Sequence, residues 1–305
     1  MSDSLSRIIC FSRTQNPKKY SRIATILACA LFVTLNAWGS QHRARTGTVV
    51  VVSFSEQRII IAGDSRAAII WNGTENARSL DDNTCKITPT DGNAVFAATG
   101  FEGTPGDDWS TYSEAQRAVA GTPHGTWMDT MTGGTALDHW ATYLVRDIDG
   151  SFTPSQLSSI TSATNGNMAF GILAGMNRAG RAWVDIARID YQDGSLVPRV
   201  GEFERRAPTS YAAFGKTDVF HEFFDGKSKR ALAERASWNR MKAASPSYDR
   251  FKTRRLVELT IKYERSNLVG GPIDEIEIDG SGIHWLQVKP ACAAGIESRQ
   301  QRVAR

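Results

Sequence analysis

Residues 47–67 read GTVVVVSFSEQRIIIAGDSRA. Two runs rich in β-branched residues, 48–54 and 58–62, are separated by a short polar link, a pattern typical of two buried strands joined as a hairpin. A second hairpin is expected at 85–89 and 93–98, around the Asp91-Gly92 turn. We expect these strands to form a first sheet that is built entirely from residues 48–99.

The rest of the chain predicts helices and a second sheet. Glycine, proline, aspartate and threonine are frequent between 104 and 134, which indicates an elaborated loop. Beyond it, apolar spacing predicts a helix from Leu137 to about Gly150, strands at 168–174 and 181–190, helices at 218–224, 229–244 and 248–263, and strands near 273–278 and 284–286. This order favours an α+β fold, a four-layer αββα sandwich of two antiparallel sheets.

The first 39 residues have the pattern of an export signal. The apolar stretch 23–38 follows a basic region and ends at Ala37-Trp38-Gly39, which suits cleavage before Ser40. An uncleaved membrane anchor is the alternative. We therefore expect a signal peptide or anchor at 1–39, a short propeptide at 40–47, the main domain at 48–289 and a tail at 290–305. The domain would be secreted or periplasmic, or membrane-anchored with the domain outside the cytoplasm.

Composition excludes several other classes of function. The 305 residues, 41% of them hydrophobic, suit an ordinary folded protein, and the excess positive charge belongs to the segment before residue 46, which has seven basic residues and one acidic residue. Acidic residues interrupt the basic run 227–255, so we expect a solvated helical face and no nucleic-acid partner. The five histidines are scattered without a shared ligand pattern, so no metal or other cofactor is expected.

Two cysteines, Cys85 and Cys292, lie in the part of the chain that would be exported. An oxidising compartment would permit a disulfide between them. Two buried free thiols are an equal alternative.

Four elements in order carry a family resemblance. They are the Gly47-Thr48 junction before a β-branched run, Asp64 in a Gly-Asp-Ser-Arg-Ala turn, Lys86, and Gly100 at the end of Phe-Ala-Ala-Thr-Gly. Together they resemble proteasome β-subunits and their bacterial relatives, which are N-terminal-nucleophile hydrolases; this chain looks like a divergent secreted member. The resemblance implies autocatalytic cleavage after Gly47 and a threonine-type peptidase or amidase with Thr48 as its nucleophile.

The resemblance also assigns roles to the other residues. A threonine hydroxyl is a weak nucleophile, and the free α-amine of Thr48, with an ordinary pKa of roughly 7.7–8.0, would serve as its base. Lys86 would lower the pKa of that amine, Asp64 would hold Lys86 as an ion pair, and the backbone N–H of Gly100 would complete an oxyanion hole.

The second half of the chain departs from the family pattern. Lys216 stands where the family carries a serine that assists the nucleophile, Ser266 stands where it carries an aspartate, and Val269 replaces a serine. Glu264 is close enough in sequence to compensate. These departures favour an alternative function, that of a catalytically inactive binding or assembly module, since a fold does not fix its chemistry.

The expected partners follow from the same resemblance. A peptide or another amide would be the substrate, and a homo-oligomer is possible because the family commonly forms rings. A ring subunit tethered by an uncleaved leader is a third hypothesis. Export would separate the chain from the cytoplasmic ATP-driven unfoldases, so we expect no such partner.

Overall fold

The computed structural model describes residues 43–47, 49–71, 74–91, 93–104, 109–162, 167–242, 247–266, 268–290 and 292. These residues belong to one unit that spans 42–305. The expected signal peptide at 1–39, most of the tail and Thr48 itself lie outside the described residues. No helix within the described ranges combines the length and the apolar character needed to cross a membrane.

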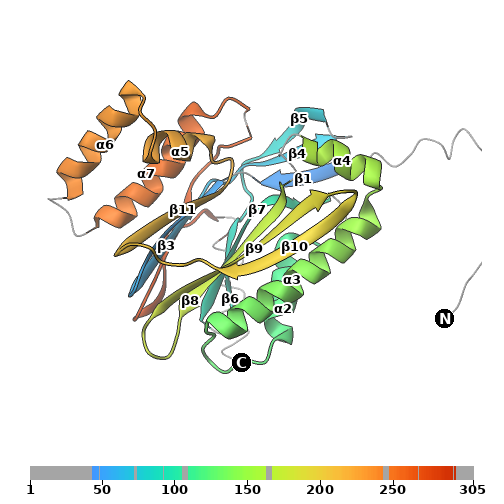
Figure 1. The fold of residues 1–305 in the computed structure, drawn as a ribbon, viewed down its shortest axis with the longest axis horizontal. Helices are drawn as coiled ribbons and strands as arrows, with labels where there is room; N and C mark the ends of the chain where they lie inside the picture. Colours follow the sequence, from blue (N-terminus) through green and yellow to red (C-terminus); the bar gives the residue numbers. More distant parts are fainter. Residues whose placement is uncertain are drawn as a thin grey trace, which may run out of the picture. The chain divides into compact units, whose positions relative to one another are not determined.

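The larger of two sheets has eight strands, and every pairing in it is antiparallel (Figure 1). One strand, β6 (Ile87–Thr90), pairs with β7 beside the end of β1. The other strands follow one another across the sheet as β10 (Ser195–Glu202), β9 (Ala182–Gln192), β8 (Asn167–Met176), β7 (Ala94–Gly103), β1 (Arg43–Gly47), β4 (Ala67–Trp71) and β5 (Thr74–Asp81).

The smaller sheet has five antiparallel strands and contains the stretch that opens the main domain. Its order is β11 (Thr209–Gly215), β2 (Val49–Ser55), β3 (Arg58–Gly63), β12 (Asp274–Asp279) and β13 (Gly282–Gln287). The strands β2 and β3 are joined as the hairpin that the sequence predicts.

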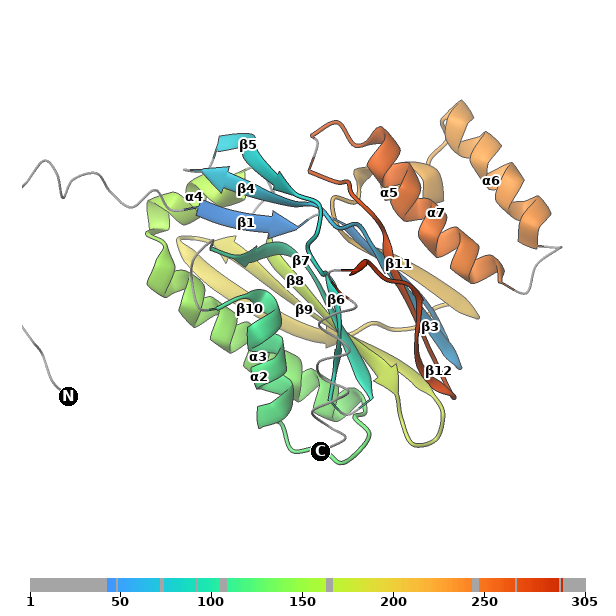
Figure 2. The same cartoon turned by 180° about the vertical axis from the view of Figure 1, so that it is seen from behind.

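Helices cover the outer face of each sheet, as the two opposite views show (Figures 1 and 2). The eight-stranded sheet packs against α2 (Thr111–Gly121), α3 (Thr130–Ser151) and α4 (Pro154–Ser162). The five-stranded sheet packs against α5 (Asp218–Phe224), α6 (Lys229–Lys242) and α7 (Tyr248–Tyr263). A third apolar cluster lies between the two sheets. The predicted α+β class, an αββα sandwich of two antiparallel sheets, is confirmed.

The uninterrupted valine run of β2 follows from this layering. Side chains of a strand alternate between two faces. Val50 and Val52 point into the cluster between the sheets, whereas Val49 and Val51 point toward the helices. Both faces are therefore dry, and all four side chains are fully buried.

The expectation that residues 48–99 form one sheet is wrong. The hairpin of β2 and β3 belongs to the five-stranded sheet, whereas β6 and β7 belong to the eight-stranded sheet. Local sequence specifies each hairpin, but the sheet that it joins depends on distant partners. Those partners are β11 and β12 for the first hairpin, and β8 for the second.

Three segments carry more regular structure than the sequence predicts. Arg43–Gly47, placed in the expected propeptide, forms β1 with neighbours on both sides. The stretch 71–83, which is rich in polar residues, contains the whole of β5, the edge strand next to β4. The expected loop 104–134 contains α2 and the start of α3, which begin at capping boxes of Ser110 with Ser113 and Asp129 with Thr132. These caps lack the glutamate or glutamine that usually marks a capping box.

A buried carboxyl lies where α3 meets the sheet. Asp185 of β9 is 1% exposed and faces Gly133 of α3, where an added β-carbon would be 2.5 Å from its Oδ2. Burial, together with the nearby carboxylates of Glu202 and Asp129, raises the pKa of Asp185 to about 8. At neutral pH the group is thus mostly uncharged in the folded chain and ionised in the unfolded chain.

The Asp185→Asn substitution should flatten the pH dependence of stability. Folding of the wild type takes up a proton at Asp185 between about pH 4 and pH 8, so its unfolding free energy falls as pH rises, by at most roughly 1.4 kcal/mol per pH unit. The unfolding free energy of the variant lacks this slope, so it rises relative to that of the wild type toward pH 8. Urea unfolding at pH 5, 6.5 and 8 measures it, with the exposed Asp193→Asn as control. Parallel curves for the two proteins would contradict the assignment.

Candidate functional site

Asp64 lies at the point where the two sheets come together. It follows β3 directly and is fully buried. Its Oδ1 accepts a hydrogen bond from Val49 N–H at 3.1 Å, and its Oδ2 accepts one from Gly270 N–H at 2.9 Å and one from Arg66 N–H at 3.3 Å. One carboxylate therefore holds the start of β2, its own turn and a loop from the far end of the chain.

Lys86 is the positive partner of this carboxylate. It precedes β6 and is also fully buried. Its Nζ lies 3.2 Å from Asp64 Oδ1 and donates to the carbonyl oxygen of Arg66 at 2.5 Å. A buried ammonium is costly unless it is paired, and these contacts provide the pairing. The expected Asp64–Lys86 ion pair is present in the structure.

Glu102 is a third charged residue of the site, and no sequence motif points to it. It lies on β7, is 3% exposed, and has its Oε1 3.8 Å from Lys86 Nζ. The signal for it was a single charged residue in the otherwise uncharged strand AVFAATGFEG. Two carboxylates and one ammonium thus lie together in a dry region.

Gly47 and Gly100 meet beside these charges. β1 pairs with β7 so that Gly47 lies opposite Gly100. A β-carbon on Gly47 would collide with Oε1 of Glu102 and lie 3.1 Å from Lys86 Nζ, so any larger residue would displace the charged groups. Gly100 has φ of +83°, and an added β-carbon there would collide with the Met168 carbonyl oxygen. The backbone of the neighbouring strand and the positive φ therefore require glycine at position 100.

The residues on either side of Thr48 belong to different sheets. Gly47 ends β1 in the eight-stranded sheet, and Val49 begins β2 in the five-stranded sheet. Gly47 lies against Glu102 and Lys86, and Val49 N–H donates to Asp64. The chain therefore changes sheets across the Gly47-Thr48-Val49 segment, beside the buried charges.

Ser266 lies in a different environment. It is exposed, and in the described part of the chain it contacts Glu264, whose Oε1 accepts its N–H at 2.9 Å, and Leu268. Burial opposes ionisation of Glu264, but hydrogen bonds from Ser266 and the nearby Lys216 ammonium give this carboxyl a lowered pKa. Lys216 follows Gly215, which pairs with Val49 at the start of β2. Lys216 and Ser266, two of the three positions that depart from the family pattern, are thus linked through Glu264.

Gly270 has a role that the sequence patterns do not indicate. The Gly270 carbonyl accepts from the N–H groups of Ser65 and Arg66, while its own N–H donates to Asp64. A β-carbon on Gly270 would collide with the Arg66 guanidinium, which is held by Asp82 at 2.6 Å. The close approach of this loop to the Asp64 turn therefore requires glycine.

The site has the donors for acid–base and electrostatic chemistry. The described residues contain no group of three or more histidine, cysteine, aspartate or glutamate side chains placed to hold a metal ion. A buried ammonium between two carboxylates can stabilise developing charge and fix the protonation state of a neighbouring amine.

Replacing Lys86 should cost more stability than replacing an ordinary lysine. Lys86→Met leaves the Asp64 and Glu102 carboxylates buried without their ammonium, a change that costs about 3–5 kcal/mol for a buried pair. The exposed Lys227→Met is the control. Adding Asp64→Asn to Lys86→Met should recover part of the loss, measured by urea unfolding. Equal stability of the Lys86 and Lys227 variants would contradict the pairing.

Comparisons with known proteins leave the family of the chain open. No family model matches the chain, and no curated protein matches it. Among solved structures it is similar to the Anbu (Gly-1) mutant from Hyphomicrobium sp. strain MC1, with a TM-score of 0.42 and 13% identity over 85% of this chain and 97% of that chain. A likeness at this level says nothing about chemistry, which must be inferred from the site itself.

Proposed function

We propose that the chain is a threonine-type hydrolase of amide bonds whose nucleophile is Thr48, exposed when the Gly47–Thr48 bond is cut. The observation that carries the proposal is the change of sheets between Gly47 and Val49, the residues on either side of Thr48. Gly47 lies against Lys86 and Glu102, and the N–H of Val49 donates to Asp64. The Gly47–Thr48 bond therefore begins at a residue that lies against two buried charged groups.

In the proposed reaction, the Thr48 hydroxyl oxygen attacks the substrate carbonyl carbon while the α-amine of Thr48 takes the hydroxyl proton. The amine then donates a proton to the leaving nitrogen, and an ester on Thr48 remains. Water, deprotonated by the same amine, hydrolyses the ester. Lys86 would favour the neutral, basic form of the amine, and the N–H of Gly100 would stabilise the oxyanion.

The position of β1 supports a peptide as the substrate. β1 lies between β4 and β7 and ends at the bond to be cut. Departure of this segment would leave a space one strand wide, bordered by the backbone groups of β4 and β7. An extended peptide can add to such edges through main-chain hydrogen bonds. The residue before the scissile bond would then occupy the place of Gly47, close to Glu102.

The disulfide supports a location outside the cytoplasm. Cys85 and Cys292 are bonded to each other. Disulfides persist mainly in oxidising compartments, which agrees with the export signal predicted at 1–39. A peptide or another amide outside the cytoplasm is the substrate class that we propose.

A second candidate function is a binding or assembly module that keeps the unprocessed chain. The observation that favours it is again β1, which has a strand on each side, so that the uncut chain completes the eight-stranded sheet. In that state the nitrogen of Thr48 would be an amide and could not act as a base. The two functions therefore differ in the N-terminal residue of the mature chain.

The mature wild type should begin at Thr48. Thr48→Ala, which lacks the hydroxyl, should retain Gly47 and the residues before it, and Thr48→Ser should be cut more slowly, as a control that keeps a hydroxyl. Intact-mass measurement of the three proteins, expressed in the same way, gives the result. A wild type that begins near Ser40 would contradict the hydrolase and favour the binding module.

Gly47→Ala should slow this cleavage by about tenfold or more, because the new β-carbon would collide with Glu102 and shift the adjacent bond. Glu102→Ala in the same chain should restore part of the rate by making room, whereas Glu102→Gln, which has nearly the same shape, should not. The fraction cut is followed by mass against time. If Glu102→Ala and Glu102→Gln have equal effects in the Gly47→Ala chain, the steric account fails.

A further inference from the structure

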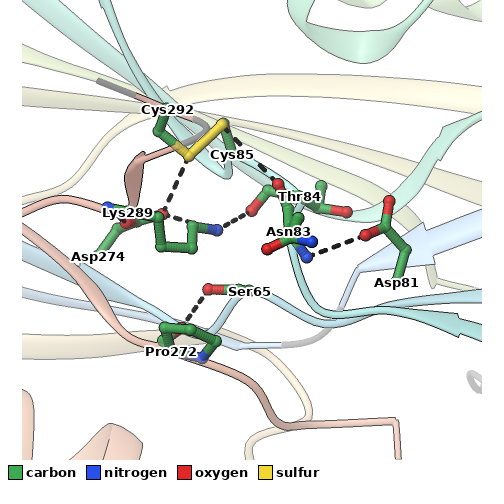
Figure 3. The surroundings of a disulfide bond; sticks show 9 residues. All are labelled: Ser65, Asp81, Asn83, Thr84, Cys85, Pro272, Asp274, Lys289 and Cys292. Atoms are coloured by element: carbon green, nitrogen blue, oxygen red, sulfur yellow. Dashed lines mark hydrogen bonds and ion pairs between the residues drawn. A yellow bond between two sulfur atoms is a disulfide. The ribbon is translucent and has the colours of Figure 1, made fainter. Parts of the chain in front are cut away.

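A second buried ion pair joins Lys289 to Asp274 (Figure 3). Lys289 and Asp274 are both nearly fully buried, and Lys289 Nζ lies 3.0 Å from Asp274 Oδ2. The Lys289 N–H also donates to Asp274 Oδ1 at 3.0 Å. Asp274 begins β12 and pairs across to Gly63, the residue before Asp64. Asp274 and Asp64, the acidic residues of the two ion pairs, are therefore close neighbours, Asp274 at the start of β12 and Asp64 directly after β3.

The C-terminal segment that carries Lys289 contacts the chain just before Lys86. Lys289 Nζ donates to the carbonyl oxygen of Thr84. Cys292 is bonded to Cys85, although 207 residues separate them in sequence. Figure 3 shows the ammonium of Lys289 and the disulfide meeting this short segment from the same side. Residues 289–292 thus hold both residues that lead into Lys86.

The same segment is held on its other side by the turn that carries Asp64. Thr84 N–H donates to the carbonyl oxygen of Ser65 at 3.1 Å. Ser65 is itself fixed by a hydrogen bond from its hydroxyl to the carbonyl oxygen of Pro272 (Figure 3). Thr84 and Cys85 are therefore clamped between the Asp64 turn and the C-terminal segment, and Lys86 follows directly.

The two pairs also interact electrostatically. Burial lowers the pKa of Lys289, Asp274 opposes this effect, and the Lys86 ammonium lowers the pKa further. Burial raises the pKa of Asp274, Lys289 opposes this effect, and the Asp64 carboxylate raises it further. A change in the charge of one pair is therefore felt by the other.

Stability alone does not account for an ion pair in this place. A buried salt bridge is weak evidence for stability, because apolar residues of similar volume often stabilise as well or better. The disulfide already ties the C-terminal segment to Cys85. The Lys289–Asp274 pair adds a hydrogen bond from Lys289 to the carbonyl oxygen of Thr84, two residues before Lys86. It also adds charges that interact with Lys86 and Asp64.

We propose that the C-terminal segment Lys289–Cys292 is a positioning element of the hydrolase, in which Lys289, held by Asp274, and the Cys85–Cys292 disulfide together fix the Lys86 ammonium relative to Asp64. This inference rests on the proposed function, since it assigns the segment to the Gly47–Thr48 cleavage. Lys289 and Asp274 act through Lys86 and do not touch the bond that is cut.

The experiment measures the rate of Gly47–Thr48 cleavage in the full chain, from pH 6 to pH 9, for two double variants. Cys85→Ser/Cys292→Ser removes the disulfide, and Lys289→Met/Asp274→Asn removes the charges of the second pair without leaving one unpaired. The control is Arg188→Met/Asp190→Asn, which removes an ion pair of the larger sheet. Lys289→Arg tests rescue by a residue that keeps the charge and the donors.

Both double variants should be cut at least tenfold more slowly than the wild type at temperatures where they remain folded. The pH profile should shift for Lys289→Met/Asp274→Asn, whereas the control should match the wild type and Lys289→Arg should recover part of the rate. Unchanged rates and pH profiles, with only a lower unfolding temperature, would show that the segment stabilises the fold without positioning Lys86, and would overturn the proposal.

Amide hydrogen exchange separates this proposal from the proposed function. If the wild type is never cut, the hydrolase proposal fails, and with it the role in cleavage. The positioning of Lys86 is then read from exchange at Lys86 and Ile87, which should be faster in both double variants and unchanged in strand β9. Equal exchange at Lys86 and Ile87 in wild type and variants would overturn the positioning itself.

Discussion

The structure depends on one carboxylate that is shielded from water. Asp64 accepts three backbone N–H groups and lies 3.2 Å from the ammonium of Lys86. These groups come from β2, from the turn after β3, from the loop at Gly270 and from Lys86, which precedes β6. Removing any partner would leave a buried polar group unsatisfied, which costs free energy in proportion to its burial. The start of the main domain, its end and both sheets are thereby held at a single point.

This constraint accounts for the residues that surround the centre. Gly47 has no side chain because Glu102 and Lys86 occupy the space, and Gly270 has none because the Arg66 guanidinium does. The disulfide and the Lys289–Asp274 pair bring the C-terminal segment to the same place. The buried charges and the change of sheets therefore meet at the two residues that flank Thr48, and the cross-link reaches Cys85, the residue before Lys86. For this reason the chemistry is assigned there.

The sequence predicts the layers of the fold well and the topology of its sheets poorly. Val49–Val52 and the isoleucine run of β3 are recognisable because strands buried on both faces read as continuous apolar runs. Their sheet membership depends on β11 and β12, which lie more than 150 residues further along the chain. β1 and β5 carry Arg-Ala-Arg-Thr-Gly and Thr-Glu-Asn-Ala-Arg-Ser-Leu-Asp, and neither pattern indicates a strand. Both strands are specified by their neighbours in the sheet.

The candidate site was also predicted only in part from the sequence. Asp64, Lys86, Gly47 and Gly100 follow recognisable motifs, and the structure brings them together; their catalytic roles stay predictions. Glu102 carried only the weak signal of a charge within a buried strand, and the disulfide was one of two equal alternatives, since pairing cannot be read from spacing. Ser266 lies on an exposed turn with Glu264, and its role beside the nucleophile stays a prediction. The contact between Cys85 and Cys292 joins residues far apart in sequence and is decided by tertiary packing.

The central claim is that the Asp64–Lys86 centre activates Thr48 as a nucleophile. It is tested most directly by incubating the mature chain with an amide-mimicking electrophile, such as a peptidyl β-lactone, and locating the adduct by peptide mass spectrometry. The account predicts one acyl group on the Thr48 hydroxyl, formed much more slowly in Lys86→Arg, which keeps a positive charge but not its geometry. A mature chain that begins at Thr48 and gains no adduct there, or gains it equally fast in both proteins, would contradict the account.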